Sequence, residues 1–403
     1  MSELLTLNDV LAAKERISQT CIQTNLIYSY ELSHEFNNEV YLKPENLQVT
    51  GAFKIRGALN KIKKLTDEEK KRGLIASSAG NHAQGVAYSG HALGIDVTIV
   101  MPETTPLIKV QATKNWGANV VLSGKIYDEA YNTAKRLEAE NGYTFIHPFD
   151  DFDVMAGQGT IALEILEELP DADVILVPVG GGGLISGIAV AAKSINPNIK
   201  VIGVESTGAA GMRHSLDVGH VDPLTKVDSI ADGAAVKVAG TNTFEIVKEY
   251  VDDIITIDDE DLIEAIFLLV EKHKIVSEAT GALPIAALKK LGMEGKKVVS
   301  VISGGNIDVL TMSSLLNRGL HSRGRLFCFS VKLQDTPGQL VKVANILAGL
   351  GANVVKLDHN QFKALDRLRH VALEVTVETN GHEHIAEIKR AMEAEGYDLE
   401  IIY

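Results

Sequence analysis

The stretch VILVPVGGGGL, residues 174–184, decides the fold class of this chain. Its first half is apolar and β-branched, which is typical of a strand buried on both faces. The uncharged run 174–192 approaches the roughly 20 residues of a membrane helix, but Pro178 and the four glycines from Gly180 interrupt it. We therefore predict a buried strand, a tight loop and a helix inside a water-soluble core.

Strands and helices alternate on both sides of this stretch. The expected strands cover residues 39–42, 74–77, 97–101, 119–122, 143–147, 174–179, 201–205 and 298–302, and the intervening helices include 54–64, 159–168 and 259–272. Residues 206–238 are expected to be irregular. The alternation predicts an α/β fold with mostly parallel sheets.

The composition limits the possible functions. A chain of 403 residues with a formal net charge of -14 suggests two or three domains, and argues against nucleic acid and acidic membranes as partners. Cys21 and Cys328 lie far apart and form no disulfide framework, and residues 1–16 lack the apolar core of a signal peptide. We expect a cytoplasmic protein in a reducing compartment.

The last 77 residues (327–403) change character. After a basic linker, 319–326, strands are expected at 326–333, 353–358, 370–377 and 399–402. Helices are expected at 382–395 and from a Thr336 cap, followed by Pro337, to Leu350. The order βαββαβ predicts a ferredoxin-like module.

A second stretch, TGAFKIRGA (50–58), places Lys54 between Phe53 and Ile55, among small residues. Burial disfavours the ammonium form, so such a lysine becomes a nucleophile that can form a Schiff base with a carbonyl or with pyridoxal phosphate. The structural alternative is a lysine at a helix start whose stem packs while its amine reaches water.

Three turns of small residues follow expected strands: SSAGNH (77–82), GGGG (180–183) and SGGN (303–306). The glycine loop suits a phosphate, although it lacks the Lys-Ser/Thr pair of a P-loop. A nicotinamide dinucleotide stays possible because of Glu205, but Ser186 occupies the third glycine place. Taken alone, each of these turns could simply be a loop that caps the following helix. Together with Lys54 they indicate a phosphate-bearing cofactor and a small anionic substrate.

Five motifs, in order, resemble the threonine dehydratases (threonine ammonia-lyases), fold-type II pyridoxal-phosphate enzymes of the serine/threonine dehydratase family and the tryptophan synthase β class. They are TGAFKIRGA (50–58), SAGNHAQG (78–85), AGQGT (156–160), GGGGL (180–184) and SGGN (303–306). The resemblance implies a catalytic domain, 1–318, with a small lobe, about 50–148, inserted in a large one. The DTPG turn (335–338) makes residues 327–403 resemble an ACT domain, a family that often binds amino acids.

The resemblance also implies roles for individual residues. Lys54 would hold pyridoxal 5'-phosphate covalently and act as the catalytic base. The remaining cofactor and substrate contacts would come from Phe53 beside the ring, Asn81 at the ring hydroxyl, Gly180, Gly181, Gly182, Gly183 and Leu184 at the phosphate, Ser303 at the ring nitrogen, and Ser77, Ser78, Asn81 and His82 at the substrate carboxylate. No metal site is expected, because Gly211 stands where a racemase-like site, with Glu205 and Ala209, would need a carboxylate.

The implied reaction is the conversion of L-threonine to 2-oxobutanoate and ammonia, and also of L-serine to pyruvate. The alternatives are a serine racemase, which Ala79 disfavours because a methyl group moves no proton, a β-replacement enzyme, and a non-enzymatic amino-acid sensor. Isoleucine or another branched-chain amino acid would act at the ACT-like module as an allosteric effector. That module could instead only join subunits of a homodimer or homotetramer.

Overall fold

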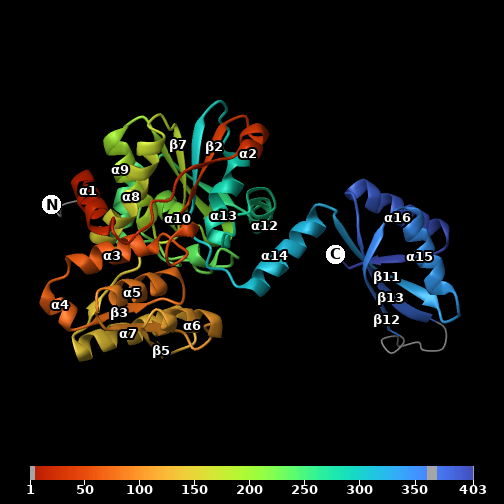
Figure 1. Ribbon diagram of the computed structural model, residues 1–403, viewed down its shortest axis with the longest axis horizontal. Coiled ribbons are helices and arrows are strands. Elements are labelled where there is room, and N and C mark those ends of the chain that lie inside the picture. Colours follow the sequence, from red (N-terminus) through yellow and green to blue (C-terminus); the bar gives the residue numbers. More distant parts are fainter. Residues whose placement is uncertain (1–4, 361–369, 403) are drawn as a thin grey trace. The chain divides into compact units, whose positions relative to one another are not determined.

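The computed structural model describes residues 5–360 and 370–402 (Figure 1). Residues 1–4 of the segment expected not to be a signal peptide lie outside it. Contacts divide the chain into two units, Met1–Asp308 and Val309–Tyr403. No helix in the described part of the chain combines the length and apolar character needed to cross a membrane.

The larger sheet of the first unit has the strand order β1-β2-β10-β7-β8-β9, and only its edge pair β1–β2 is antiparallel. β7 is buried along its length, as predicted, and runs parallel to β10. The glycine loop after β7 and the turn after β10 therefore leave the same edge of the sheet. The strands are β1 (Ile27–Tyr28), β2 (Glu39–Pro44), β7 (Val174–Pro178), β8 (Lys200–Ser206), β9 (Asp253–Ile257) and β10 (Lys297–Ile302).

The smaller sheet, order β5-β4-β3-β6, is entirely parallel. Its strands are β3 (Leu74–Ser77), β4 (Val97–Met101), β5 (Asn119–Leu122) and β6 (Thr144–Phe145). In Figure 1 this sheet and its helices form a lobe of their own beside the larger sheet. The predicted α/β architecture with two open, mainly parallel sheets is confirmed.

Helices flank both sheets, and some boundaries differ from the prediction. α8 begins at Phe152 instead of Gly159, because the Asp151 carboxylate accepts hydrogen bonds from the first backbone N–H groups of the helix. α10 forms inside the segment expected to be irregular, and α12 ends at Leu268 and continues as a π-helical turn, η4 (Leu269–His273). The helices are α1 (Leu7–Ile17), α2 (Tyr30–Glu35), α3 (Lys54–Lys64), α4 (Asp67–Lys71), α5 (Asn81–Ala92), α6 (Leu107–Asn115), α7 (Tyr127–Asn141), α8 (Phe152–Glu168), α9 (Gly183–Ile195), α10 (Gly211–Val218), α11 (Thr241–Tyr250), α12 (Asp259–Leu268) and α13 (Ala279–Ala286), with short 3₁₀ turns η1 (Glu45–Leu47), η2 (Thr207–Ala209), η3 (Asp232–Ala234) and η5 (Ala287–Lys290).

The second unit is an antiparallel sheet of order β12-β13-β11-β14 with two helices, the ferredoxin-like arrangement predicted from the sequence. A preceding helix, α14 (Val309–Ser322), extends through the first four residues of the expected linker 319–326. The elements are β11 (Leu326–Gln334), α15 (Gln339–Gly349), β12 (Asn353–Asn360), β13 (His370–Glu378), α16 (His382–Ala394) and β14 (Leu399–Ile401).

The predicted Thr336 cap is wrong. Gly338, in the left-handed region at φ 94°, precedes the first helical residue, Gln339. A residue other than glycine would be strained in the backbone conformation of position 338. Gly338 therefore makes the turn, and the helix begins three residues after Thr336.

Helix α3, which begins at Lys54, crosses α8 at very short range. A Cβ atom added to Gly157 would lie 2.6 Å from the Cα of Gly57 and 2.5 Å from the carbonyl oxygen of Arg56. The two backbones can approach this closely only because both positions are glycine. Gly157, in the motif AGQGT (156–160), therefore serves the packing of α8 against α3.

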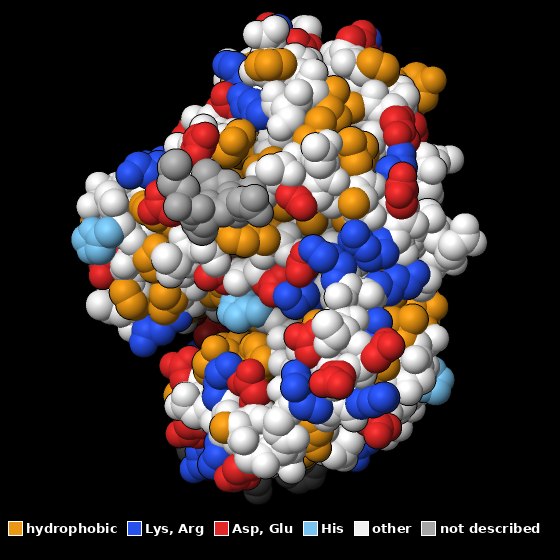
Figure 2. Space-filling model, turned by 90° about the vertical axis from the view of Figure 1, so that its left-hand side faces the viewer, with side chains coloured by type: hydrophobic (Ala, Val, Ile, Leu, Met, Phe, Trp, Pro, Cys, Tyr) orange, Lys and Arg blue, Asp and Glu red, His pale blue; other side chains and the backbone are white. Residues whose placement is uncertain are grey.

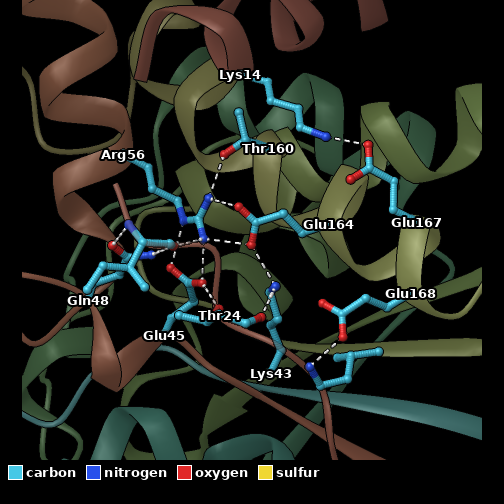
Figure 3. Close-up of polar contacts among 12 residues, drawn as sticks. Lys14, Thr24, Lys43, Glu45, Gln48, Arg56, Thr160, Glu164, Glu167 and Glu168 are labelled. Carbon is cyan, nitrogen blue, oxygen red and sulfur yellow. Dashed lines mark hydrogen bonds and ion pairs between the residues drawn. The ribbon is translucent and has the colours of Figure 1, made fainter. Parts of the chain in front are cut away.

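A buried cluster of four charges ties α3 to the larger sheet (Figure 3). Arg56 lies 2.7 Å from Glu45 and 2.6 Å from Glu164, and Lys43 lies 2.6 Å from Glu164. All four side chains are at most 7% exposed, and their formal charges sum to zero. Thr160 accepts a further bond from Arg56. Because each charge is paired, the cluster holds α3 in one position.

Partly exposed ion pairs lie near this buried cluster. Figure 2 shows Lys and Arg side chains gathered on the face that carries α1 and α3, with acidic side chains among them. Lys14 pairs with Glu167, and Lys61 lies 2.8 Å from Asp151. This face is therefore mixed in charge. Such solvent-screened pairs contribute little to stability.

Glu164→Gln should lower the free energy of unfolding by about 3–5 kcal/mol, because it leaves Arg56 and Lys43 with one carboxylate between them in a buried site. Urea unfolding of the cofactor-free protein measures this loss. Glu167→Gln, on the same helix with a side chain 54% exposed, is the matched control and should cost less than about 1 kcal/mol. Equal losses in the two variants would contradict the role assigned to the cluster.

Candidate active site

All the site residues predicted from the sequence line one cavity of about 990 Å³ in the first unit. Its walls come from both sheets: the loop after β3, the start of α3, the glycine loop after β7 and the turn after β10. The predicted lining residues are Phe53, Lys54, Ser77, Ser78, Asn81, His82, Gly180, Gly181, Gly182, Gly183, Leu184 and Ser303. The fold thus brings together groups that lie up to 250 positions apart in sequence.

Lys54 is partly buried, and its amine donates a 2.7 Å hydrogen bond to the carbonyl oxygen of Pro148. The amine also lies 5.3 Å from the centre of the Phe53 ring. Burial lowers the pKa of Lys54 to about 8, and the nearby Glu278 opposes this shift. The structure therefore favours the reactive amine over the alternative of a lysine whose amine simply reaches water.

The glycine loop joins β7 to the N-terminus of α9, where free backbone N–H groups and the helix dipole favour an anion. Gly182 has φ 95°, a region that favours glycine. A Cβ at Gly181 would lie 2.4 Å from the Phe149 ring, and one at Gly183 would lie 2.8 Å from the Phe149 carbonyl oxygen. The glycines are thus needed for a close backbone approach, because side chains at Gly181 and Gly183 would collide with Phe149.

Ser303 follows β10 directly and is 1% exposed. Its hydroxyl is buried and has no hydrogen-bond partner in the described part of the chain. Its carbonyl oxygen accepts a 3.0 Å bond from the N–H of Phe53, so the Ser303 turn and the Lys54 stretch are joined directly. A buried, unpaired hydroxyl is costly unless a bound group pairs with it.

The loop after β3 supplies the remaining polar groups. The Ser77 hydroxyl and the Asn81 side-chain oxygen are buried and unpaired among the described residues. The His82 ring bonds the Ile146 carbonyl oxygen at 2.9 Å, and burial, with Lys54 nearby, lowers the pKa of His82 to about 3. His82 is therefore a neutral ring at physiological pH and brings no charge to an anionic substrate.

Glu278 is the main site residue that the sequence analysis missed. It precedes α13, lines the cavity and is 5% exposed, and its carboxylate accepts a 2.7 Å bond from the Asn81 amide. Thr280, also in the cavity wall, has a hydroxyl with no hydrogen-bond partner among the residues that the structure describes. The one available signal was a single acid among small residues in the stretch VSEATGA (276–282).

Glu205 lies outside this cavity wall and caps α10. Its carboxylate accepts bonds of 2.9 Å and 2.8 Å from the backbone N–H groups of Met212 and Arg213. Burial raises the pKa of Glu205 to about 7. Among residues 5–360 and 370–402, no three His, Cys, Asp or Glu side chains are grouped so that they could hold a metal ion.

The family model for pyridoxal-phosphate dependent enzymes matches residues 17–304 of this chain. The chain belongs to that family. It is 47% identical to an L-threonine ammonia-lyase of Thermotoga maritima, over 99% of this chain and 100% of the relative. It is also 47% identical to the catabolic L-threonine dehydratase TdcB of Staphylococcus aureus strain N315, over 79% of this chain and 94% of that relative.

Solved structures agree with this assignment. Threonine deaminase isoform 2 of Solanum lycopersicum, in its processed form, superposes with a TM-score of 0.75 at 39% identity, covering 77% of this chain and 91% of that one. Maize serine racemase also gives 0.75, at 34% identity, covering 79% of this chain and 99% of that one. The two-sheet first unit is therefore the fold-type II architecture expected from the sequence.

The cavity fits the pyridoxal phosphate on which this family depends. The glycine loop offers a cradle for a phosphate and Lys54 an amine of lowered pKa. The Ser303 hydroxyl and the Asn81 side-chain oxygen are buried polar atoms with no partner among residues 5–360 and 370–402. These are the kinds of group that a phosphorylated pyridine aldehyde can pair with.

Lys54→Met should stabilise the cofactor-free protein at pH 7, because the folded state holds an ammonium there that burial disfavours. The pKa of Lys54 falls from 10.5 to about 8 on folding. This cost is absent above pH 10.5, grows as the pH falls to 8, and is constant below it. The gain should be about 3 kcal/mol at pH 7 and shrink towards pH 10. Urea titrations of both proteins at several pH values measure it, and a pH-independent difference would contradict the lowered pKa.

Proposed function

We propose that this chain converts L-threonine to 2-oxobutanoate and ammonia, and L-serine to pyruvate, with pyridoxal 5'-phosphate bound at Lys54. The observation that carries the proposal is the buried Lys54 amine, placed in one cavity with the glycine loop. The names of the similar proteins from T. maritima and S. aureus support the substrate and the reaction.

The proposed cofactor contacts come from residues around the cavity. The N–H groups of the loop Gly180–Gly183 and Leu184 would bind the phosphate. Asn81 would bond the ring hydroxyl, Ser303 the ring nitrogen, and Phe53 would pack beside the ring. When bound, pyridoxal phosphate withdraws electrons from the substrate's α carbon and so makes its proton acidic.

The chain's own residues then supply binding and proton transfer. Ser77, Ser78 and the N-terminal end of α5, at Asn81 and His82, would hold the substrate carboxylate, because hydroxyl and backbone N–H groups meet there. The Lys54 amine, with its pKa near neutrality, would take the α proton. The neutral Ser303 hydroxyl cannot stabilise a full charge at the ring nitrogen as a carboxylate would, which favours elimination over transamination.

Serine racemisation is the second candidate, because maize serine racemase has the same fold. Ala79 lines the cavity next to Ser78. Its methyl group cannot carry a proton on a second face of the substrate. Elimination is therefore favoured over racemisation.

Purified protein with pyridoxal phosphate should release 2-oxo acid and ammonia from L-threonine and from L-serine, and little D-serine from L-serine. Coupled 2-oxo acid assays and chiral chromatography measure these products. Lys54→Ala should lose turnover by a factor of at least 10³ and also lose the visible absorption band of the bound cofactor. A wild-type protein that forms no such band would overturn the enzyme proposal in favour of an amino-acid sensor, and turnover that requires an added nucleophile would point to β-replacement.

We further propose that the second unit is an ACT domain through which isoleucine or another branched-chain amino acid controls the enzyme, in a cytoplasmic homodimer or homotetramer. Its βαββαβ order supports this. The T. maritima relative matches the whole chain, whereas the S. aureus relative matches only 79% of it over nearly its full length. Enzymes of this kind therefore occur without about a fifth of this chain, as expected if that part regulates rather than catalyses.

Ending the chain after Ser322, the last residue of α14, should leave threonine turnover within about threefold and abolish any response to isoleucine. Initial rates with and without isoleucine, or with AMP in its place, measure the response, and gel filtration compares the subunit number. An isoleucine effect that persists in the shortened chain would place the effector site in the first unit.

A further inference from the structure

Glu278 occupies a position that connects three segments of the cavity wall. Its backbone N–H donates a 3.0 Å bond to the carbonyl oxygen of Gly304, in the turn that follows Ser303. Its carboxylate lies so close to this turn that a Cβ at Gly304 would be 2.5 Å from it. The same carboxylate accepts the 2.7 Å bond from the Asn81 amide at the start of α5. Glu278 is thus fixed by the backbone on one side and bonded to Asn81 on the other.

The bond between Glu278 and Asn81 uses only one end of the Asn81 amide. The nitrogen donates to Glu278, while the oxygen is buried and has no partner in the described part of the chain. An amide has a donor end and an acceptor end, and half a turn about its last side-chain bond exchanges them. The group that holds one end therefore decides which end is left for a ligand.

A carboxyl group can hold either end, depending on its proton. An ionised Glu278 only accepts hydrogen bonds, so it holds the Asn81 nitrogen and leaves the oxygen as an acceptor. A protonated Glu278 has an O–H to donate, so it can hold the Asn81 oxygen and leave the nitrogen as a donor. Leaving two acceptors or two donors facing each other in a buried site is costly, so the protonation state of Glu278 imposes this choice.

We propose that Glu278 is a positioning residue that sets, by gaining or losing one proton, whether Asn81 presents an acceptor or a donor to the bound cofactor. This inference rests on the cofactor site of the proposed function and goes beyond it. It requires that pyridoxal phosphate contacts Asn81, and it is independent of which amino acid is the substrate.

Burial and the charges around Glu278 bring the pKa of its carboxyl group close to physiological pH. Burial, and then the Asp232 carboxylate, raise the pKa of Glu278 to about 7, while the bond from Asn81, the Lys109 ammonium and the Asn306 backbone N–H oppose the rise. Lys54 also interacts with Glu278. Lys109 and Asp232 both line the cavity and form a 2.8 Å ion pair with each other.

The test is a titration of the holoenzyme's visible absorption spectrum between pH 6 and 9, which needs no substrate. The wild-type spectrum should change with a single midpoint. Glu278→Gln keeps the size of the side chain and cannot titrate, so the amplitude of the change should fall at least fivefold. Glu205→Gln is the matched control, because Glu205 is also buried with its pKa raised to about 7 but caps α10 away from Asn81. Its titration should match the wild type.

Two further variants test the direction of the effect. Asp232→Asn removes a charge that raises the pKa of Glu278 and releases Lys109, so the midpoint should move down by roughly 0.5 pH unit. Lys109→Met should move it up by a similar amount. If Glu278→Gln does not bind cofactor, Glu278→Asp replaces it. Its shorter carboxyl group reaches Asn81 poorly, so the spectral change should again be reduced.

The proposal would be overturned by a wild-type spectrum without a transition, by a transition that survives in Glu278→Gln, or by a midpoint that moves up in Asp232→Asn or down in Lys109→Met. A holoenzyme that titrates as expected but does not release 2-oxo acid from threonine would refute the proposed reaction and leave the role of Glu278 standing. The two failures are therefore distinguishable.

Discussion

The site depends on the buried charge cluster of Arg56, Glu45, Glu164 and Lys43. Arg56 lies two residues after Lys54, and its guanidinium is bonded to carboxylates from η1 and α8. A hydrophobic contact in this place could slide by an ångström at little cost, whereas a paired guanidinium in a dry interior cannot move without exposing an unpaired charge. The α3–α8 crossing at Gly57 and Gly157 adds a steric limit in the same place. The backbone position of Lys54 is thus fixed by interactions outside the cavity, which leaves the cavity wall free to serve chemistry.

The sequence predicted most of the first unit, and physical reasons explain where it did not. The runs 174–178 and 97–101 are apolar and end at glycine or proline, so local patterns were sufficient there. The predicted start of α8 at Gly159 was wrong because the cap is Asp151, and Gly157 lies inside the helix, where it permits close contact with α3. α10 was missed because its cap is Glu205, a residue six positions before the helix begins rather than next to it. The Thr336 cap failed because Gly338 adopts the left-handed turn that starts α15.

Some residues of the candidate site could likewise be predicted from the sequence, whereas others could not. Lys54, the glycine loop and Ser303 could be recognised because each is a short motif with small neighbours. Glu278 could not be recognised, because its importance comes from Asn81 and Gly304, which are near it only in the folded chain. A lone glutamate before a helix normally caps that helix or faces solvent, and no local pattern distinguishes it from a buried acid. Residues of this kind are found only when the tertiary structure shows which groups share a buried space.

Burial shifts the pKa values of Lys54 and Glu278, two of the titratable groups that line the cavity, in opposite directions. It lowers the pKa of the Lys54 amine to about 8 and raises the pKa of the Glu278 carboxyl to about 7, because a dry environment disfavours the charged form of each. Both pKa values are thereby brought towards neutrality, that of Lys54 as the proposed base and that of Glu278 as the group that holds Asn81. A base whose pKa lies near the working pH is the condition for efficient general base catalysis. The neutral Ser303 hydroxyl and the neutral His82 ring add no charge that would separate the two values again. Loss of hydration therefore shifts the pKa values of Lys54 and Glu278 more than any single charged neighbour does.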